Sequence, residues 1–130
     1  MVTNDPLANV LSHIQNAEIA GKKTCSVQPA SKFILQVLTL LQNHHYLGAI
    51  EKLPDGKSGT LKLELLGTIN KCNVIKPRYP FKKATLEKFE KRHLPARGFG
   101  VIIVSTSAGL MDHEKARESN LGGRVIAYCY

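Results

Sequence analysis

Apolar residues recur with the period of an α-helix over residues 7–14 and again over residues 33–41. Asp5-Pro6 precedes the first segment, and an aspartate that can cap a helix, followed by proline, is a typical helix start. Gly21 is placed to end this helix, and Ser31 is placed to cap the second one. The apolar stripe of the second segment is wide and must be buried. The chain therefore begins with two amphipathic helices.

Three shorter segments have the character of strands. Thr24–Val27 lies between the helices, and Ala49–Leu53 follows Gly48, which we expect to end the second helix. In Thr60–Leu66 leucines alternate with charged residues, which predicts a strand with one buried and one wet face. The order helix, strand, helix, strand, strand predicts a small α/β N-terminal lobe over residues 1–68.

The second half of the chain combines strands with short helices. Four consecutive apolar β-branched residues at Val101–Val104 predict a buried strand, and Arg124–Tyr130 predicts a final one. Thr85 and Asp112 are placed to start short helices. We expect a β-rich C-terminal lobe over residues 69–130, so that the whole chain is of the α/β (α+β) class.

Three hydroxyl side chains follow the buried strand, at Ser105, Thr106 and Ser107. If the chain stays extended there, alternation places Ser105 and Ser107 on one face and Thr106 on the other. The chain then leaves the sheet through Gly109, which can adopt the positive φ of a sharp exit. The hydroxyls can contact the ribose 2′-OH groups and phosphates of RNA, or they can satisfy their own backbone in a turn.

A nucleophilic serine is the third interpretation of these hydroxyls. It would need a base, and His113 is the only nearby candidate. Ser105 lies between Val104 and Thr106, so the G-x-S-x-G elbow that often carries such a serine is missing. Capping and solvent exposure explain Asp112-His113-Glu114 more simply than chemistry does. We therefore expect no catalytic residue and no enzyme activity.

Charge points to a polyanionic partner. The chain of 130 residues carries 18 Lys and Arg against 10 Asp and Glu, a formal net charge of +8 with a pI near 9.6. Nucleic acid is the commonest partner that neutralises such a charge, and an anionic membrane surface is second. No apolar run approaches the roughly 20 residues of a membrane span, and no secretory signal pattern opens the chain. We expect no membrane partner.

The cysteines and histidines do not have metal-binding spacings. Cys25, Cys72 and Cys129 are odd in number and widely spaced, which disfavours a disulfide framework and indicates a reducing compartment. His44 and His45 are helix neighbours that diverge by about 100°, so they cannot both face one metal. No pair has a zinc spacing such as C-x-x-C. We expect no metal and no cofactor.

Several cations lie where a phosphate could bind. Lys22 and Lys23 follow the first helix, in a turn that is equally well explained as a solvated loop. Ser31 and Lys32 open the second helix, where free amides favour an anion, although an ordinary cap beside a surface lysine fits as well. Lys76-Pro77-Arg78-Tyr79 interleaves cations with a tyrosine, which suits phosphate contact and stacking; the alternative is an edge segment with a packed tyrosine.

Residues 82–93 are densely charged around a thin apolar stripe at Leu86 and Phe89. Lysine and arginine outnumber Glu87 and Glu90 in this segment. It is either a second basic surface or a solvated amphipathic helix, and the solvated helix is the simpler interpretation.

The motif Ser105–Met111, with Ala116-Arg117 and Gly122–Val125 behind it, resembles the C-terminal signature of the universal small-subunit ribosomal protein eight family. The resemblance continues near the start of the chain in Asp5–Ala8 and Ile14–Ala17. It is specific because it combines ordered residue types over about twenty-five C-terminal positions.

Other segments indicate the branch of the family. Val74–Tyr79 and the insertion after it resemble the archaeal and eukaryotic branch, and residues 82–93 have no bacterial counterpart. The first helix carries His13 and Gln15 where many bacterial members have basic residues.

The resemblance implies a non-enzymatic protein of the small ribosomal subunit. Its two lobes would bind the central domain of small-subunit ribosomal RNA, beside neighbouring small-subunit ribosomal proteins, and support early assembly of the platform in the cytosolic ribosome. No small-molecule substrate, cofactor or metal is implied. The alternative is a free-standing RNA-binding regulator of its own message. The candidate RNA-binding residues are Ser105, Thr106, Ser107, Ala108, Gly109, Asn16, Lys22, Lys23, Ser31, Lys32, Lys71, Lys76, Arg78, Tyr79, Arg97 and Arg124.

Overall fold

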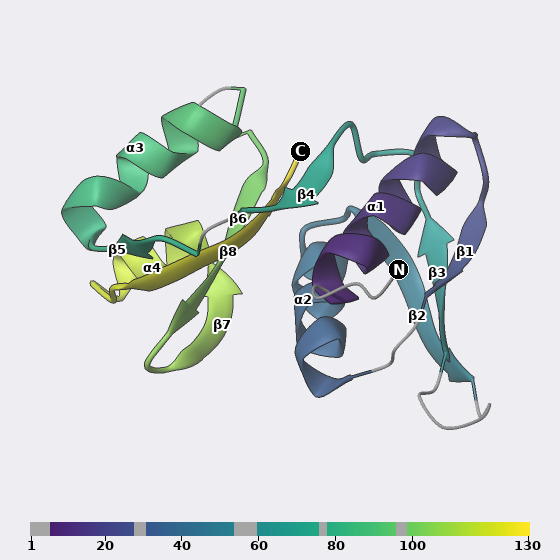
Figure 1. Ribbon diagram of the computed structural model, residues 1–130, viewed down its shortest axis with the longest axis horizontal. Helices are drawn as coiled ribbons and strands as arrows, with labels where there is room; N and C mark the ends of the chain where they lie inside the picture. Colours follow the sequence, from purple (N-terminus) through teal and green to yellow (C-terminus); the bar gives the residue numbers. More distant parts are fainter. Residues whose placement is uncertain (1–5, 28–30, 54–59, 76–77, 96–98) are drawn as a thin grey trace. The chain divides into compact units, whose positions relative to one another are not determined.

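The computed structural model describes residues 6–27, 31–53, 60–75, 78–95 and 99–130. The chain forms two compact units, Met1–Cys72 and Asn73–Tyr130 (Figure 1). Asp5, Lys76 and Arg97, which the sequence singles out as a helix cap and two RNA contacts, lie outside the described residues.

The first unit packs two helices on one face of an antiparallel three-stranded sheet of order β1-β3-β2 (Figure 1). Its elements are α1 (Pro6–Ile19), β1 (Thr24–Val27), α2 (Lys32–Asn43), β2 (Leu47–Leu53) and β3 (Thr60–Leu65). This is the predicted order of elements. The predicted end of α1 is also confirmed, because the chain turns there through Gly21 at φ 75°.

The core of the first unit lies between the helices and the sheet. Leu61, Leu63 and Leu65 of β3 are buried, and Lys62 and Glu64 between them are exposed, as the alternation predicts. The helices supply matching buried stripes, of which the one on α2 consists of Ile34, Val37, Leu38 and Leu41. Burying each such aliphatic side chain stabilises the fold by about 1.5–3 kcal/mol relative to leaving it exposed.

The second unit is built on a five-stranded antiparallel sheet with the path β4-β8-β6-β7, and β5 also pairs with β8. Its elements are β4 (Cys72–Val74), β5 (Pro80–Phe81), α3 (Lys83–His93), β6 (Val101–Thr106), β7 (Gly109–Asp112), α4 (His113–Glu118) and β8 (Gly123–Cys129). The buried strand predicted at Val101–Val104 is confirmed, and β6 lies between β7 and β8. The predicted α+β class, with a β-rich second lobe, is confirmed.

The prediction that Gly48 ends the second helix is wrong. α2 ends at Asn43, and His45 adopts φ 66°, a left-handed conformation that reverses the chain at once. Gly48 instead lies in β2, where the side chain of Glu64 packs against it: a Cβ there would lie 3.0 Å from Glu64 Cδ. The glycine makes room for a side chain on the neighbouring strand.

The charged helix of the second unit also differs from its prediction. α3 starts at Lys83, not Thr85, and the Thr85 hydroxyl accepts a hydrogen bond of 2.8 Å from the amide of Lys82 at the helix start. Thr85 therefore belongs to the first turn and supports the cap from inside. Leu86 and Phe89 are buried as expected, but Glu90 is buried with them.

Candidate RNA-binding surface

The hydroxyl segment forms the end of a β-hairpin. β6 ends at Thr106, Ser107-Ala108 forms a two-residue turn, and β7 begins at Gly109 with φ 112°. The prediction that the chain leaves the sheet here is wrong, because the chain returns to pair with β6. Gly109 does have the positive φ that was predicted. Ser107 lies in the turn, so the predicted alternation of three hydroxyls extends only to Thr106.

Thr106 uses its hydroxyl to hold the turn. Its Oγ1 donates to the Gly109 carbonyl at 2.9 Å and accepts from the Ala108 amide at 3.1 Å. This is the turn interpretation of the hydroxyls, and it holds for Thr106. Ser107 and Ala108 are exposed at the tip, and Ser105 is half-buried. The hairpin therefore presents small side chains on a turn that is fixed from within.

A row of side chains crosses the sheet beside this turn. In the registers of the strands, Pro80 pairs with Arg124, Arg124 pairs with Ser105, and Ser105 pairs with Leu110. Directly paired residues of antiparallel strands share a face. Arg124 is exposed, and its Nη1 donates to the Arg78 carbonyl at 3.2 Å. The structure thus brings Arg78, Arg124 and Ser105 together from three separate segments.

Two glycines allow these strands to approach one another. A Cβ on Gly123 would overlap the Ser105 carbonyl, and a Cβ on Gly122 would lie 2.9 Å from the Phe81 carbonyl. No side chain larger than hydrogen fits at either position without moving a backbone. The Gly-Gly pair is therefore what places Arg124 next to Ser105.

Tyr79 is partly packed against the core of its unit. Its ring lies 6.0 Å from that of Phe89 at a tilt of 30°, and its carbonyl accepts from the Val125 amide at 3.1 Å. The residue is nevertheless 39% exposed. The tyrosine therefore packs within its unit, as one of the two alternatives predicts, and part of its surface stays open. Arg78 before it is exposed.

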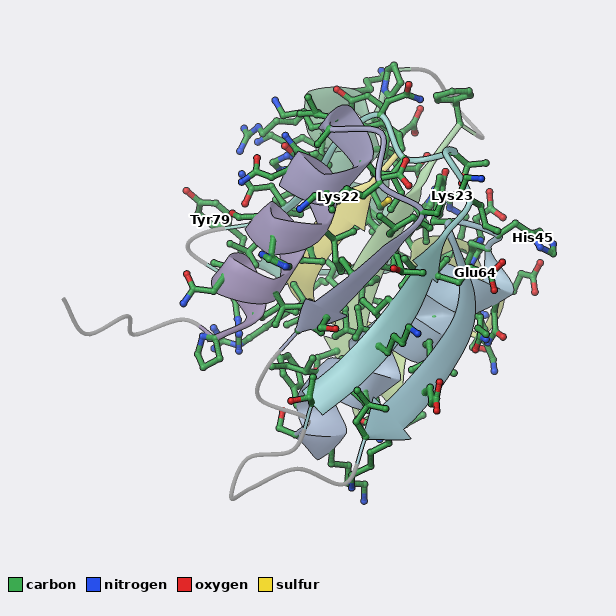
Figure 2. All side chains as sticks on the ribbon, turned by 90° about the vertical axis from the view of Figure 1, so that its right-hand side faces the viewer. Lys22, Lys23, His45, Glu64 and Tyr79 are labelled. Carbon is green, nitrogen blue, oxygen red and sulfur yellow. The ribbon has the colours of Figure 1, made fainter. Side chains whose placement is uncertain are left out.

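In the first unit, the candidate residues form smaller groups. Lys22 and Lys23 are exposed where the chain passes from α1 to β1 (Figure 2). They line a surface hollow together with Lys62 and three carboxylates, those of Glu18, Glu51 and Glu64. This mixture of charges binds phosphate less strongly than cations alone would.

The remaining candidates of the first unit are also at the surface. Ser31 caps α2, and its Oγ accepts from the Ile34 amide at 3.2 Å beside the exposed Lys32. Asn16 is exposed on α1. Lys71 is exposed next to Cys72, whose amide donates to Gln15 Oε1 on the same helix at 3.0 Å.

Positive charge is concentrated in the second unit. Asn73–Tyr130 contains eleven Lys and Arg against five Asp and Glu, which gives +6 of the total +8. All five arginines of the chain lie there. Arginine is the side chain best suited to planar, bidentate contact with phosphate. The unit that carries the hairpin therefore also carries the stronger field for a nucleic acid.

A family model described as Ribosomal protein S8 matches residues 5–130, nearly the whole chain. The chain belongs to the ribosomal protein S8 family. It is therefore a ribosomal protein that binds ribosomal RNA, works in the small subunit and serves translation. The S8 family is one of structural ribosomal proteins, not of enzymes.

The surroundings of His113 agree with a structural role in this S8-family chain. The sequence suggested that this histidine is exposed, but it is only 1% exposed. Its Nδ1 accepts from the Ile102 amide at 3.0 Å, which continues the hydrogen bonding of β6 beyond the end of β7. Because Nδ1 is an acceptor, the neutral ring carries its proton on Nε2, and that atom lies 3.9 Å from Glu90 Oε1. The ring is therefore buried, bonded to β6 and close to Glu90 of α3, and is not exposed as a base for Ser105.

The cysteines of this S8-family chain lie in the interior of the protein. All three cysteines are buried and none forms a disulfide, and burial raises the pKa of Cys25 from 9.0 to about 11. In the part of the chain that the structure describes, no three His, Cys, Asp or Glu side chains gather as metal ligands do. Within the same residues, no helix is long and apolar enough to cross a membrane.

Proposed function

We propose that this S8-family protein binds the central domain of small-subunit ribosomal RNA through the β6–β7 hairpin and the row beside it. The observation that carries this proposal is the pairing of Arg124 with Ser105, next to the exposed turn Ser107-Ala108. It places a guanidinium, small hydroxyls and an open backbone within one short stretch of surface. The shallow minor groove of RNA offers the matching phosphates and 2′-OH groups.

Each part of this surface has a distinct task. The guanidinium of Arg124, already oriented by the Arg78 carbonyl, retains donors for a phosphate. Ser105 and Ser107 fix the register by donating to or accepting from riboses. Ala108 and Gly109 have no bulk, so the RNA backbone can approach closely. Thr106 holds the turn in shape from behind. Shape carries the specificity more than base reading does.

The first unit adds further backbone contacts. Lys22, Lys23, Lys32 and Lys71, with Asn16 and Ser31 beside them, are exposed and suited to phosphates. These contacts raise affinity through counterion release without selecting a sequence. Lys76 and Arg97 are assigned the same role on sequence alone.

Filter binding to a central-domain RNA fragment across a salt series tests the division of tasks. Ser105→Ala with Ser107→Ala should weaken binding while the slope of log affinity against log salt stays unchanged. Arg78→Gln with Arg124→Gln should lower that slope by about 2, because each lost phosphate contact removes about one counterion. The exposed pair Ser26→Ala with Ser119→Ala is the matched control for the hydroxyls.

Two results would contradict the proposal. One is wild-type affinity for the Ser105→Ala, Ser107→Ala variant. The other is equal affinity of the wild-type protein for a fragment from another domain of the same RNA.

We further infer that the protein belongs to the archaeal and eukaryotic branch, supports early assembly of the platform and contacts neighbouring proteins of the cytosolic small subunit. Co-sedimentation tests the role in the particle against a free-standing regulator. A ribosomal protein should be found with small subunits at near-equal stoichiometry. A regulator of its own message should be found mostly in the unbound fraction.

A further inference from the structure

The outward side of α3 is strongly positive. Lys88, Lys91 and Arg92 are exposed, and the helix start adds Lys82 and Lys83. Lys88 is three residues from Lys91 and four from Arg92, so the three charges are neighbours on the helix surface. Like charges at this spacing repel one another, and a solvated helix usually alternates signs to avoid this. We refer to Lys82, Lys83, Lys88, Lys91 and Arg92 as the α3 basic surface.

The structure removes one of the two carboxylates that would offset this charge. Glu90 is 5% exposed and forms an ion pair with Arg117 of α4, close to His113 Nε2. Its charge is used inside the unit, which leaves Glu87 as the exposed carboxylate of residues 82–93. Among the described residues, no carboxylate lies within ion-pair distance of Lys88, Lys91 or Arg92. Five cations therefore face solvent against one anion.

α3 is also held firmly in its unit. Leu86 and Phe89 are buried in the core. The ring of His93 stacks on Tyr128 with centroids 5.2 Å apart, and Lys83 Nζ donates to Asn120 Oδ1 at 2.7 Å. A helix anchored along its length presents its charges in a fixed array. Little backbone freedom is then lost when a partner binds.

We infer that the α3 basic surface is a second ribosomal RNA contact, which binds backbone phosphates independently of the hairpin. The exposed residues between the cations are Ala84, Thr85 and Glu87, without the aromatic or large aliphatic anchors on which protein interfaces depend. Phosphates need no such anchors, since release of counterions supplies the affinity. The inference rests on the RNA binding of the family and not on the hairpin being the first contact.

The test compares two pairs of lysines in the full chain, with a naked ribosomal RNA fragment that extends beyond the central domain. Lys88→Gln with Lys91→Gln should weaken binding and lower the salt slope by about 2. Lys52→Gln with Lys115→Gln removes the same charge from exposed positions outside both proposed surfaces and should leave the slope nearly unchanged. Lys88→Arg with Lys91→Arg should bind as the wild type does.

Two outcomes would overturn the inference, and a third would overturn the hairpin site alone. Equal slopes for the two glutamine pairs would mean that net charge alone acts. Normal binding of the Lys88→Gln, Lys91→Gln variant to naked RNA, with reduced incorporation into small subunits, would assign the surface to a protein partner. If the α3 variant loses affinity while the hairpin variants bind normally, the second contact stands and the proposed hairpin site fails.

Discussion

Thr106 illustrates how one hydroxyl can serve the fold beside others that face solvent. Its Oγ1 both donates and accepts inside the turn, whereas Ser107 is exposed at the tip. All three hydroxyls of Ser105–Ser107 look alike in the sequence. The structure distinguishes them because β6 ends at Thr106, and the hydroxyl of that residue bonds within the turn.

Thr106→Val removes both of these hydrogen bonds and keeps the β-branched shape. The unfolding free energy should fall by about 1–2 kcal/mol, since each net bond contributes about 0.5–1.5 kcal/mol. Thr106→Ser keeps the hydroxyl and should lose less. Urea denaturation followed by circular dichroism measures both, and equal losses for the two variants would rule out this role for the hydroxyl.

Cys25 gives a pH dependence that can be predicted in sign. Its pKa is raised from 9.0 to about 11, mainly by burial and next by the nearby carboxylate of Glu18. The folded state therefore favours the protonated thiol, and this stabilisation is present below pH 9 and lost as the pH rises through 11. The stability advantage of the wild type over Cys25→Ala should shrink between pH 8 and pH 10.5. Urea midpoints of both proteins at the two pH values measure this difference in stability. A difference that stays constant would contradict a raised pKa of Cys25.

At the scale of elements, α3 and α4 depend on a charge pair that joins them. Glu90 is 5% exposed, and its partner Arg117 is 31% exposed. An ion pair of this kind adds little over an apolar pair, but removing one member leaves the other charge buried and unpaired. The pair therefore specifies how the two helices dock more than it adds stability.

Arg117→Met should destabilise the protein by about 3 kcal/mol, because it leaves the Glu90 carboxylate buried without its cation. Adding Glu90→Leu to that variant should restore much of the loss. Urea denaturation of the two single variants and the double variant gives the coupling directly. Glu87→Gln, an exposed neighbour, is the control and should change stability by less than about 0.5 kcal/mol. A double variant as unstable as Arg117→Met would contradict the ion-pair assignment.

Elements with strong local signals could be predicted from the sequence. The Ser31 cap, the turn at Gly21 and the alternation in β3 all depend on residues within a few positions of each other. β7 was missed because Gly109–Asp112 is short and has no alternation of its own, so only its pairing with β6 makes it a strand. The burial of Glu90 was missed because it depends on Arg117, which is far along the chain.

The neighbours within the candidate site also depend on strand pairing. Charge and the family motif indicate Arg78, Ser105 and Arg124 separately, and the register of β8 shows that Arg124 and Ser105 are neighbours. Nothing in the composition indicates that Leu110 and Pro80 complete the row, because only strand pairing places them there. Leu110 lies beside Ser105 because Gly109–Asp112 forms a strand that pairs with β6.

At the scale of the whole molecule, charge is divided unequally along the chain. The second unit holds +6 of the +8, and the arginines are confined to it. Two surfaces of that unit, the hairpin row and the α3 basic surface, are assigned to RNA on different grounds. The first surface combines arginines with hydroxyl side chains. The second carries cations, mostly lysines, that have few carboxylates beside them. Affinity that depends strongly on salt is expected from both.

The buried thiols have a practical consequence. Since Cys25, Cys72 and Cys129 are all buried in the folded protein, a maleimide dye should react selectively with a cysteine placed by Ser119→Cys, which is exposed and lies outside both proposed surfaces. The three natural cysteines then need not be replaced first, and the fluorophore can follow binding to an RNA in real time without blocking the proposed contacts.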